Sequence, residues 1–148
     1  MRVSQRRTSF ISLRMISVMA DEIGRVLATL DAAGMRETTV VVFQSNNGGV
    51  RDTMFSGEAA VAGDLPADNS PFRDGKGTLF EGGTRVVGVV NWPGQVPAGK
   101  VKGMFHVTDM YPALAGLAGA ALGKNKPLDG MDVWDPIAPR AKPRPGPR

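Results

Sequence analysis

Residues 40–49, VVVFQSNNGG, constrain the fold more than any other stretch of this 148-residue sequence. The run begins with four apolar residues, and such a run is typical of a strand that is buried on both faces in a parallel sheet. It ends in Asn46, Asn47 and two glycines. In open α/β sheets, ligands bind beyond the carboxyl ends of the strands. The stretch therefore predicts a strand over residues 40–43 and a ligand-binding loop at Asn46 and Asn47.

Apolar spacing predicts the elements that accompany this strand. Apolar residues recur three and four apart over residues 16–33, which predicts an amphipathic helix. Residues 85–91, RVVGVVN, predict a second strand. A further helix is expected over residues 108–122, with Thr108 or Asp109 as its cap. Together these elements indicate an α/β fold class, with a small and mostly parallel sheet flanked by helices and long loops.

The net charge of +4 comes from the two ends of the chain. Residues 1–14 carry four arginines and no acid, and residues 139–148 carry four basic residues and no acid. We therefore expect a mobile basic arm over residues 1–14, a folded body over residues 15–138 and a disordered Pro/Arg-rich tail over residues 139–148. No aromatic residues are interleaved with the arginines of the tail, so we expect no nucleic-acid partner.

Composition excludes several kinds of site and partner. The chain has no cysteine and one histidine, which excludes disulfides, thiolate metal sites, a cysteine nucleophile and paired-histidine metal sites. No apolar run approaches the ~20 residues of a membrane span, so we expect none. The first 20 residues imitate a signal peptide only faintly, because Arg14 interrupts the apolar region. The compartment stays open, with a cytoplasmic location as the default.

Lys76 is the first candidate for chemistry in residues 45–84, a stretch that we predict to be mostly irregular. Long loops of this kind are commonly functional or poorly ordered. Lys76 lies between Gly75 and Gly77, so no neighbouring side chain crowds its ammonium, which can face an anion. A phosphate-binding loop is excluded, because its pattern requires glycine and a hydroxyl where Ser70 and Gly77 stand. The alternative is an ordinary surface lysine in a glycine-rich loop.

The other titratable residues favour structural interpretations. His106 directly precedes a predicted helix cap, and a lone histidine in that position is more often a structural hydrogen-bonding residue than a catalyst. The loop acids Asp52, Asp64, Asp68 and Asp74 lack the spacing of metal ligands, so we interpret them as solvated side chains.

Four blocks of sequence together resemble a known family. The blocks are TLDAAGMRETTVVVFQSNNGG, RDGKGTLFEGGTRVVGVVNWPG, FHVTDMYPALAGLAG and LDGMDVWDPI. Their order and approximate spacing resemble the arylsulfatase branch of the type I sulfatases over roughly residues 15–138. The resemblance implies an alkaline-phosphatase-like α/β fold, of which these residues would form the later part of the catalytic domain. It also implies the hydrolysis of sulfate esters.

The resemblance implies roles for individual residues. In the family the strand ends in Ser-Asp-Asn-Gly, whose Asp and Asn bind calcium, and the matching positions are Asn46 and Asn47. Asn46 departs from the pattern, and its amide oxygen brings no charge to a hard cation, so we do not expect this chain alone to bind calcium well. Lys76 matches the family lysine that contacts the substrate sulfate. His106 matches a recurrent position that we do not interpret as catalytic.

The nucleophile that the resemblance implies is missing. Family members attack sulfur with a formylglycine made from Cys or Ser in Cys/Ser-x-Pro-x-Arg. Residues 69–73, NSPFR, carry the proline and the arginine, but Asn69 cannot be converted to formylglycine. Moreover, this segment matches the family stretch that precedes the lysine block, so we interpret its likeness to the nucleophile motif as chance. We therefore assign no catalytic residue.

These observations lead to one interpretation and one alternative. We interpret the chain as a catalytically incomplete part of a sulfatase domain. It would be a truncated gene product, a gene-model fragment or one half of a split gene, and in the last case the missing amino-terminal half would be its partner. The implied substrate is a small sulfate ester or a sulfated glycan, and many family members are exported. The alternative is a non-catalytic module that binds polyanions through Lys76 and the basic ends.

Overall fold

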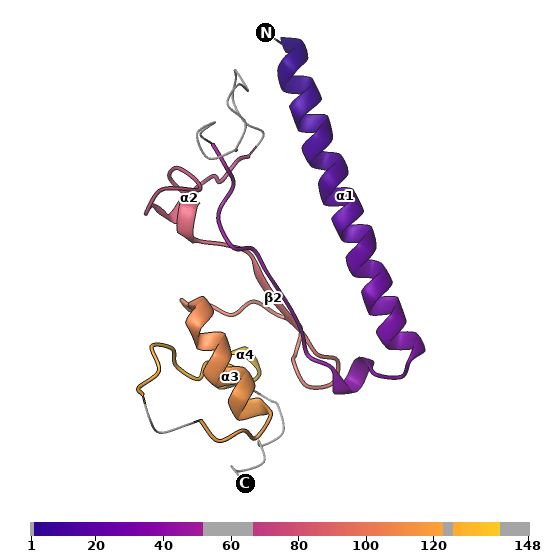
Figure 1. The fold of residues 1–148 in the computed structure, drawn as a ribbon, viewed down its shortest axis with the longest axis vertical. Coiled ribbons are helices and arrows are strands. Elements are labelled where there is room, and N and C mark those ends of the chain that lie inside the picture. The colour runs from indigo at the N-terminus through magenta and orange to yellow at the C-terminus, as the bar shows by residue number, and fades with distance from the viewer. Residues whose placement is uncertain (1, 52–66, 123–125, 140–148) are drawn as a thin grey trace. The chain divides into compact units, whose positions relative to one another are not determined.

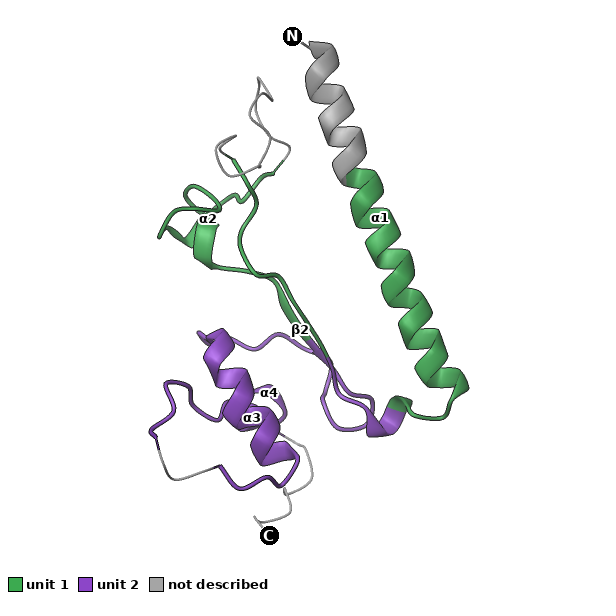
Figure 2. Ribbon diagram, in the orientation of Figure 1, with its two compact units in different colours: residues 1–36, 42–89 green, residues 37–41, 90–148 purple. Residues whose placement is uncertain are grey.

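The computed structural model describes residues 2–51, 67–122 and 126–139, with side chains from residue 13 onward. The chain divides into two compact units, which Figure 2 shows in different colours. Unit 1 comprises residues 1–36 and 42–89, and unit 2 comprises residues 37–41 and 90–148. The candidate residues of the long loop thus belong to unit 1, and His106 belongs to unit 2.

The amino-terminal helix of unit 1, α1, spans Arg2–Ala32 (Figure 1). The predicted start at residue 16 is therefore wrong, and the backbone of the basic arm is helical from Arg2 onward. Apolar spacing marks the stretch of a helix that can pack against a partner, but it does not mark where the helix begins. The mobility of the arm stays a prediction, and the tail from residue 140 onward lies outside the described residues.

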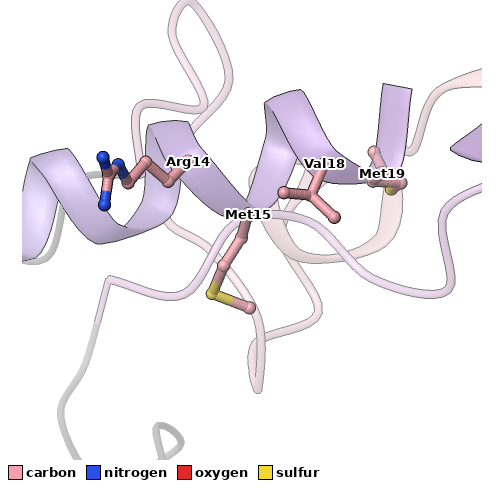
Figure 3. Close-up of a pocket in the computed structure, with 4 residues that line it drawn as sticks. All are labelled: Arg14, Met15, Val18 and Met19. Carbon is pink, nitrogen blue, oxygen red and sulfur yellow. The ribbon is translucent and has the colours of Figure 1, made fainter. Parts of the chain in front are cut away.

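The apolar face of α1 is largely exposed. Met15, Val18 and Val26 are 68%, 60% and 58% exposed. Figure 3 shows Met15, Val18 and Met19 beside Arg14, and these four residues line a hollow that contains none of the candidate residues. Within the described part of the chain, no helix is long and apolar enough to cross a membrane.

Two short strands form the sheet, as predicted. β1 spans Val41–Gln44 and β2 spans Gly88–Asn91. A hydrogen bond from Ser45 N to Val87 O at 3.0 Å continues their pairing. The α/β class is confirmed, but the strands run antiparallel, so the prediction of a mostly parallel sheet is wrong for this pair. An apolar run carries no information on strand direction, which depends on the connection between the strands.

Both strands are less buried than the sequence predicts. β1 alternates half-buried and exposed residues, with Val42 39% exposed, and Val89 of β2 is 50% exposed. The prediction of a strand buried on both faces is therefore wrong for this chain. A two-stranded sheet has no flanking strands, so it leaves much of its apolar surface uncovered.

The described residues between the two strands are mostly irregular, as predicted. Their one helical element is α2, the single turn Glu81–Thr84. Asp68 is exposed, and hydrogen bonds from the Ser70 side chain and backbone hold the pKa of its carboxyl below the usual value. The expectations for Asp52 and Asp64 fall on residues outside the described part of the chain.

Unit 2 contains an apolar core. The helices that supply it are α3, Met110–Leu117, and α4, Trp134–Ile137. Trp92 packs on Trp134 with ring centroids 5.9 Å apart, and its indole N–H donates to Glu37 O at 2.6 Å. The core consists of Ala113, Val133, Trp134, Ile137 and Ala138. The helix predicted to reach residue 122 ends at Leu117, shortly before Gly119, whose φ of 68° is left-handed.

A single carboxylate joins two segments of unit 2. Asp109 is 6% exposed, and its oxygens accept hydrogen bonds from His106 N at 2.7 Å and from Met131 N at 2.9 Å. These bonds lower the pKa of Asp109. The 3-10 turn η3, Val107–Asp109, precedes α3 and is capped by His106, whereas Asp109 occupies the N-cap position of α3 without a side-chain cap hydrogen bond. Of the two predicted caps, Asp109 thus holds the predicted position on α3, and Thr108 lies inside the η3 turn.

Candidate functional site

The candidate site of unit 1 begins in the loop that follows β1. We call residues 45–49 the asparagine loop. The Ser45 hydroxyl donates to Asn47 O at 2.9 Å, which folds the loop back on itself. Gly48 N donates to Gly83 O at 3.0 Å, and a Cβ on Gly48 would collide with the carbonyl oxygen of Gly82. The loop therefore approaches the α2 turn so closely that only glycine fits at position 48.

Lys76 lies in a second loop, residues 73–78, which we call the lysine loop. Its backbone N–H donates to Gly49 O at 3.0 Å, so this hydrogen bond joins the lysine loop to the asparagine loop. Asp74 has a φ of 65°, and its carboxylate accepts a hydrogen bond from Gly75 N at 2.9 Å. The structure thus brings the predicted residues Asn46, Asn47 and Lys76 into two adjoining loops.

The cationic side chains of residues 73–85 differ in how they are held. The Arg73 guanidinium lies 3.8 Å from the centre of the Phe80 ring. The Arg85 guanidinium lies 4.7 Å from the centre of the Phe72 ring and pairs with Glu81 at 3.1 Å. Lys76 makes no ion pair within the described ranges. Within these ranges no acidic side chain holds the Lys76 ammonium, whereas both arginines pack against aromatic rings.

Asn69 joins the two loops, and sequence reasoning missed this role. Its side-chain NH₂ donates to Gly49 O at 3.0 Å and to Asp74 O at 2.9 Å. Its side-chain oxygen accepts a hydrogen bond from Gly49 N at 2.9 Å. The sequence offered only a weak signal, an amide beside a proline and a glycine-rich turn, and its partner Gly49 lies 20 residues away.

The described residues do not complete a calcium site around the predicted ligands Asn46 and Asn47. Asn46 is exposed and Asn47 is half-buried, and no hydrogen bond within the described residues occupies either side-chain amide. Calcium takes six to eight oxygen ligands, and its affinity depends on their charge. The described ranges contain no group of three or more His, Cys, Asp or Glu side chains that could hold a metal ion. The amide oxygens of Asn46 and Asn47 are a ligand type that calcium accepts, but two neutral ligands are too few for a calcium site.

His106 is a structural residue of unit 2. Its ring nitrogen Nδ1 lies 2.9 Å from the Thr108 hydroxyl and accepts from Thr108 N at 3.4 Å. Together with the Asp109 carboxylate it completes a capping box on the η3 turn. The interpretation of His106 as a structural hydrogen-bonding residue is confirmed.

Comparison with known proteins places the chain among sulfatases. Residues 12–120 match the family model described as Sulfatase. The chain is 34% identical to arylsulfatase J of Mus musculus over 84% of its own length, and 35% identical to arylsulfatase A of Homo sapiens over 75% of its length. It covers 19% and 20% of these relatives, so it spans about a fifth of their length. The resemblance predicted from the four sequence blocks is confirmed.

Solved structures agree with this assignment of the fold. The crystal structure of Ps i-CgsB is similar with a TM-score of 0.65 and 35% identity, over 78% of this chain and 23% of that one. The same protein in complex with k-i-k-neocarrahexaose gives a TM-score of 0.64 and 36% identity. The α/β fold that the resemblance implied is confirmed. No comparison supports the alternative of a polyanion-binding module.

Proposed function

Since this chain belongs to the sulfatase family, we propose that it contributes the sulfate-binding part of a site for hydrolysis of sulfate esters. Lys76 is the residue that binds the sulfate group. The observation that supports this role best is the hydrogen bond between Lys76 N and Gly49 O, because it fixes the lysine loop against the asparagine loop. Within the described residues no acidic side chain pairs with the Lys76 ammonium, which supports its proposed role as the group that binds the sulfate.

The role of Lys76 follows from the charge of the reaction. A sulfuryl group carries negative charge on its oxygens, and a cation fixed beside it stabilises the charge that develops in the transition state. A lysine acts as a point charge with three donors, which suits a tetrahedral anion. Lys76 would thus both bind the substrate and lower the barrier to attack on sulfur.

Hydrolysis needs a nucleophile that this chain does not provide. The sequence has no cysteine, and the side chain at the position of the chance motif, Asn69, is an amide whose donors and acceptor are bonded to backbone groups. We therefore propose that the chain alone binds sulfate esters without hydrolysing them. The nucleophile would come from an earlier part of a sulfatase domain, outside these 148 residues.

The asparagines would face a cation in the complete site. We propose that the amide oxygens of Asn46 and Asn47 serve as two of the oxygen ligands of a calcium ion, whose charge would help to hold the sulfate. The remaining ligands, which would include carboxylates, would come from outside the described residues. Two neutral oxygens give little affinity by themselves, so this chain alone would bind calcium weakly.

The substrate class is a sulfate ester, either a small molecule or a sulfated glycan. Similar proteins include steryl-sulfatase of Mus musculus, at 38% identity, and Ps i-CgsB, whose structure was solved in complex with k-i-k-neocarrahexaose. These names differ in the carrier of the ester, whereas the sulfate itself is common to the family. The proposal for Lys76 therefore concerns the sulfate group and leaves the carrier open.

Protection of Lys76 from amine acylation by inorganic sulfate tests the proposal. At a sulfate concentration about twice the dissociation constant, the acylation rate of Lys76 should fall about threefold. Lys100 and Lys102 are exposed lysines of unit 2 and serve as internal controls in the same peptide digest. Chloride at equal ionic strength controls for screening. Equal protection of all three lysines, or none at Lys76, would contradict the proposal.

A further inference from the structure

We propose that Asn69 is a positioning residue that holds Lys76 beside the asparagine loop. This inference rests on the proposed function of Lys76 as the sulfate-binding residue. The side-chain amide of Asn69 is half-buried, and both its oxygen and its nitrogen make hydrogen bonds. The three bonds end on backbone groups of both loops, so one side chain links them.

Two of the Asn69 hydrogen bonds end next to the hydrogen bond that the Lys76 backbone makes, one on each loop. The carbonyl of Gly49 accepts from Lys76 N and also from the Asn69 side chain, so the two donors share one acceptor. The carbonyl of Asp74, two residues before Lys76, accepts the second hydrogen of the same amide. Asn69 therefore fixes the position of the first residues of the lysine loop. It also holds the Gly49 carbonyl, to which the backbone of Lys76 donates.

The chemistry of the three bonds selects asparagine. The site requires two donors and one acceptor from a short side chain, and a side-chain amide provides both kinds of group. An ionised aspartate has the same shape but only acceptors, so it would face the carbonyls of Gly49 and Asp74 without a hydrogen. A Cβ on Gly75 would lie 2.9 Å from the Asn69 nitrogen, which shows that the amide fits tightly in this space.

The substitution Asn69→Asp tests this role, because it keeps the shape and removes only the donors. Hydrogen exchange followed by mass spectrometry at low micromolar concentration should show the Lys76 amide exchanging about tenfold faster. Protection of Lys76 by inorganic sulfate should fall to less than half of its wild-type extent. The matched control is Asp68→Asn, the reverse exchange at a neighbouring exposed residue, whose oxygen can still accept from Ser70 N. Both readouts should stay at wild-type values in the control.

Two further measurements distinguish a loss of Lys76 positioning in Asn69→Asp from general unfolding of the chain. Amide exchange in α3 of unit 2 should be unchanged in Asn69→Asp, whereas general unfolding would accelerate it. If Asn69→Asp does not fold, the wild-type chain still gives a test. The Asn69 side-chain amide should exchange at least about tenfold more slowly than those of Asn46 and Asn47, to which the structure gives no hydrogen bond within the described residues.

The outcomes distinguish this inference from the proposed function. If wild-type Lys76 gains no protection from sulfate, the proposed function fails, whatever the exchange data show. If sulfate protects wild-type Lys76 and Asn69→Asp retains both the slow exchange and the protection, Asn69 does not position Lys76 and the inference is overturned. Side-chain amides of Asn69, Asn46 and Asn47 that exchange equally fast would also overturn it.

Discussion

Different interactions stabilise the interior of each of the two units. Unit 2 packs four buried apolar residues around Trp134, which is 2% exposed. Among the described residues of unit 1, no large apolar side chain reaches that degree of burial. Its loops are joined instead by the Asn69 amide, by backbone hydrogen bonds and by glycines in close contact.

Because of this difference, the residues that stabilise the fold are not the residues that set the geometry of the candidate site. Burial of an aromatic side chain contributes several kcal/mol in total, whereas a single hydrogen bond adds about 1 kcal/mol net. The bonds around Lys76 therefore contribute little to global stability, but each has a direction that fixes a loop. We expect damage to the core to unfold unit 2 and damage to the loops to misplace Lys76.

The largest expected effect is on the core of unit 2. Trp134→Ala removes the most buried aromatic ring and leaves a cavity, so the free energy of unfolding of unit 2 should fall by about 3–5 kcal/mol. Hydrogen exchange in α3 would measure the loss. Tyr111→Ala is the matched control, because Tyr111 lies on α3 and is 62% exposed. Equal effects of the two substitutions would contradict the assignment of the core.

The loops can be disrupted without touching that core. Gly48→Ala places a Cβ against the carbonyl of Gly82, so the backbone must shift and unit 1 should lose about 1–3 kcal/mol of local stability. The expected result is faster exchange at Gly83 and Lys76, with α3 unchanged. Gly99→Ala is the control, since nothing lies within 4 Å of a Cβ there. Normal exchange at Lys76 in Gly48→Ala would argue against a tightly joined pair of loops.

These two regions also differ in how far the sequence predicts them. Both strands and the helix at Met110 follow from apolar spacing, which is a local property of the chain. The antiparallel pairing does not, because it depends on the path of the loop between the strands. The Asn69 bonds depend on a contact across 20 residues, so no local pattern contains them. Lys76 was found through its resemblance to a family motif, and the geometry that holds it was not.

A smaller effect is expected from pH on unit 2. Hydrogen bonds from His106 N and Met131 N lower the pKa of Asp109 in the folded chain. The stability that they contribute is therefore present above the unfolded carboxyl pKa of about 4 and is lost as pH falls through the lowered folded value. Urea unfolding of wild type and Asp109→Asn at several pH values would measure it. The difference between them should shrink on acidification, and a difference independent of pH would contradict this account.

The smallest expected effect is that of calcium on the asparagine loop. Because Asn46 and Asn47 offer two neutral oxygens, calorimetry should detect no binding tighter than roughly millimolar. Asn46→Asp restores one charged ligand and should increase the affinity, and Gln44→Glu adds the same charge on β1 as a control. Micromolar binding by the wild type that disappears in Asn47→Ala would show that this loop forms a complete metal site.

The most direct test of the central claim measures binding and turnover of 4-nitrophenyl sulfate on one sample of the full chain. The account predicts that the ester protects Lys76 from acylation more than it protects Lys100, and that no 4-nitrophenolate is released, with or without calcium. Release of 4-nitrophenolate that disappears in Lys76→Ala would contradict the account, because this chain would then contain a nucleophile of its own.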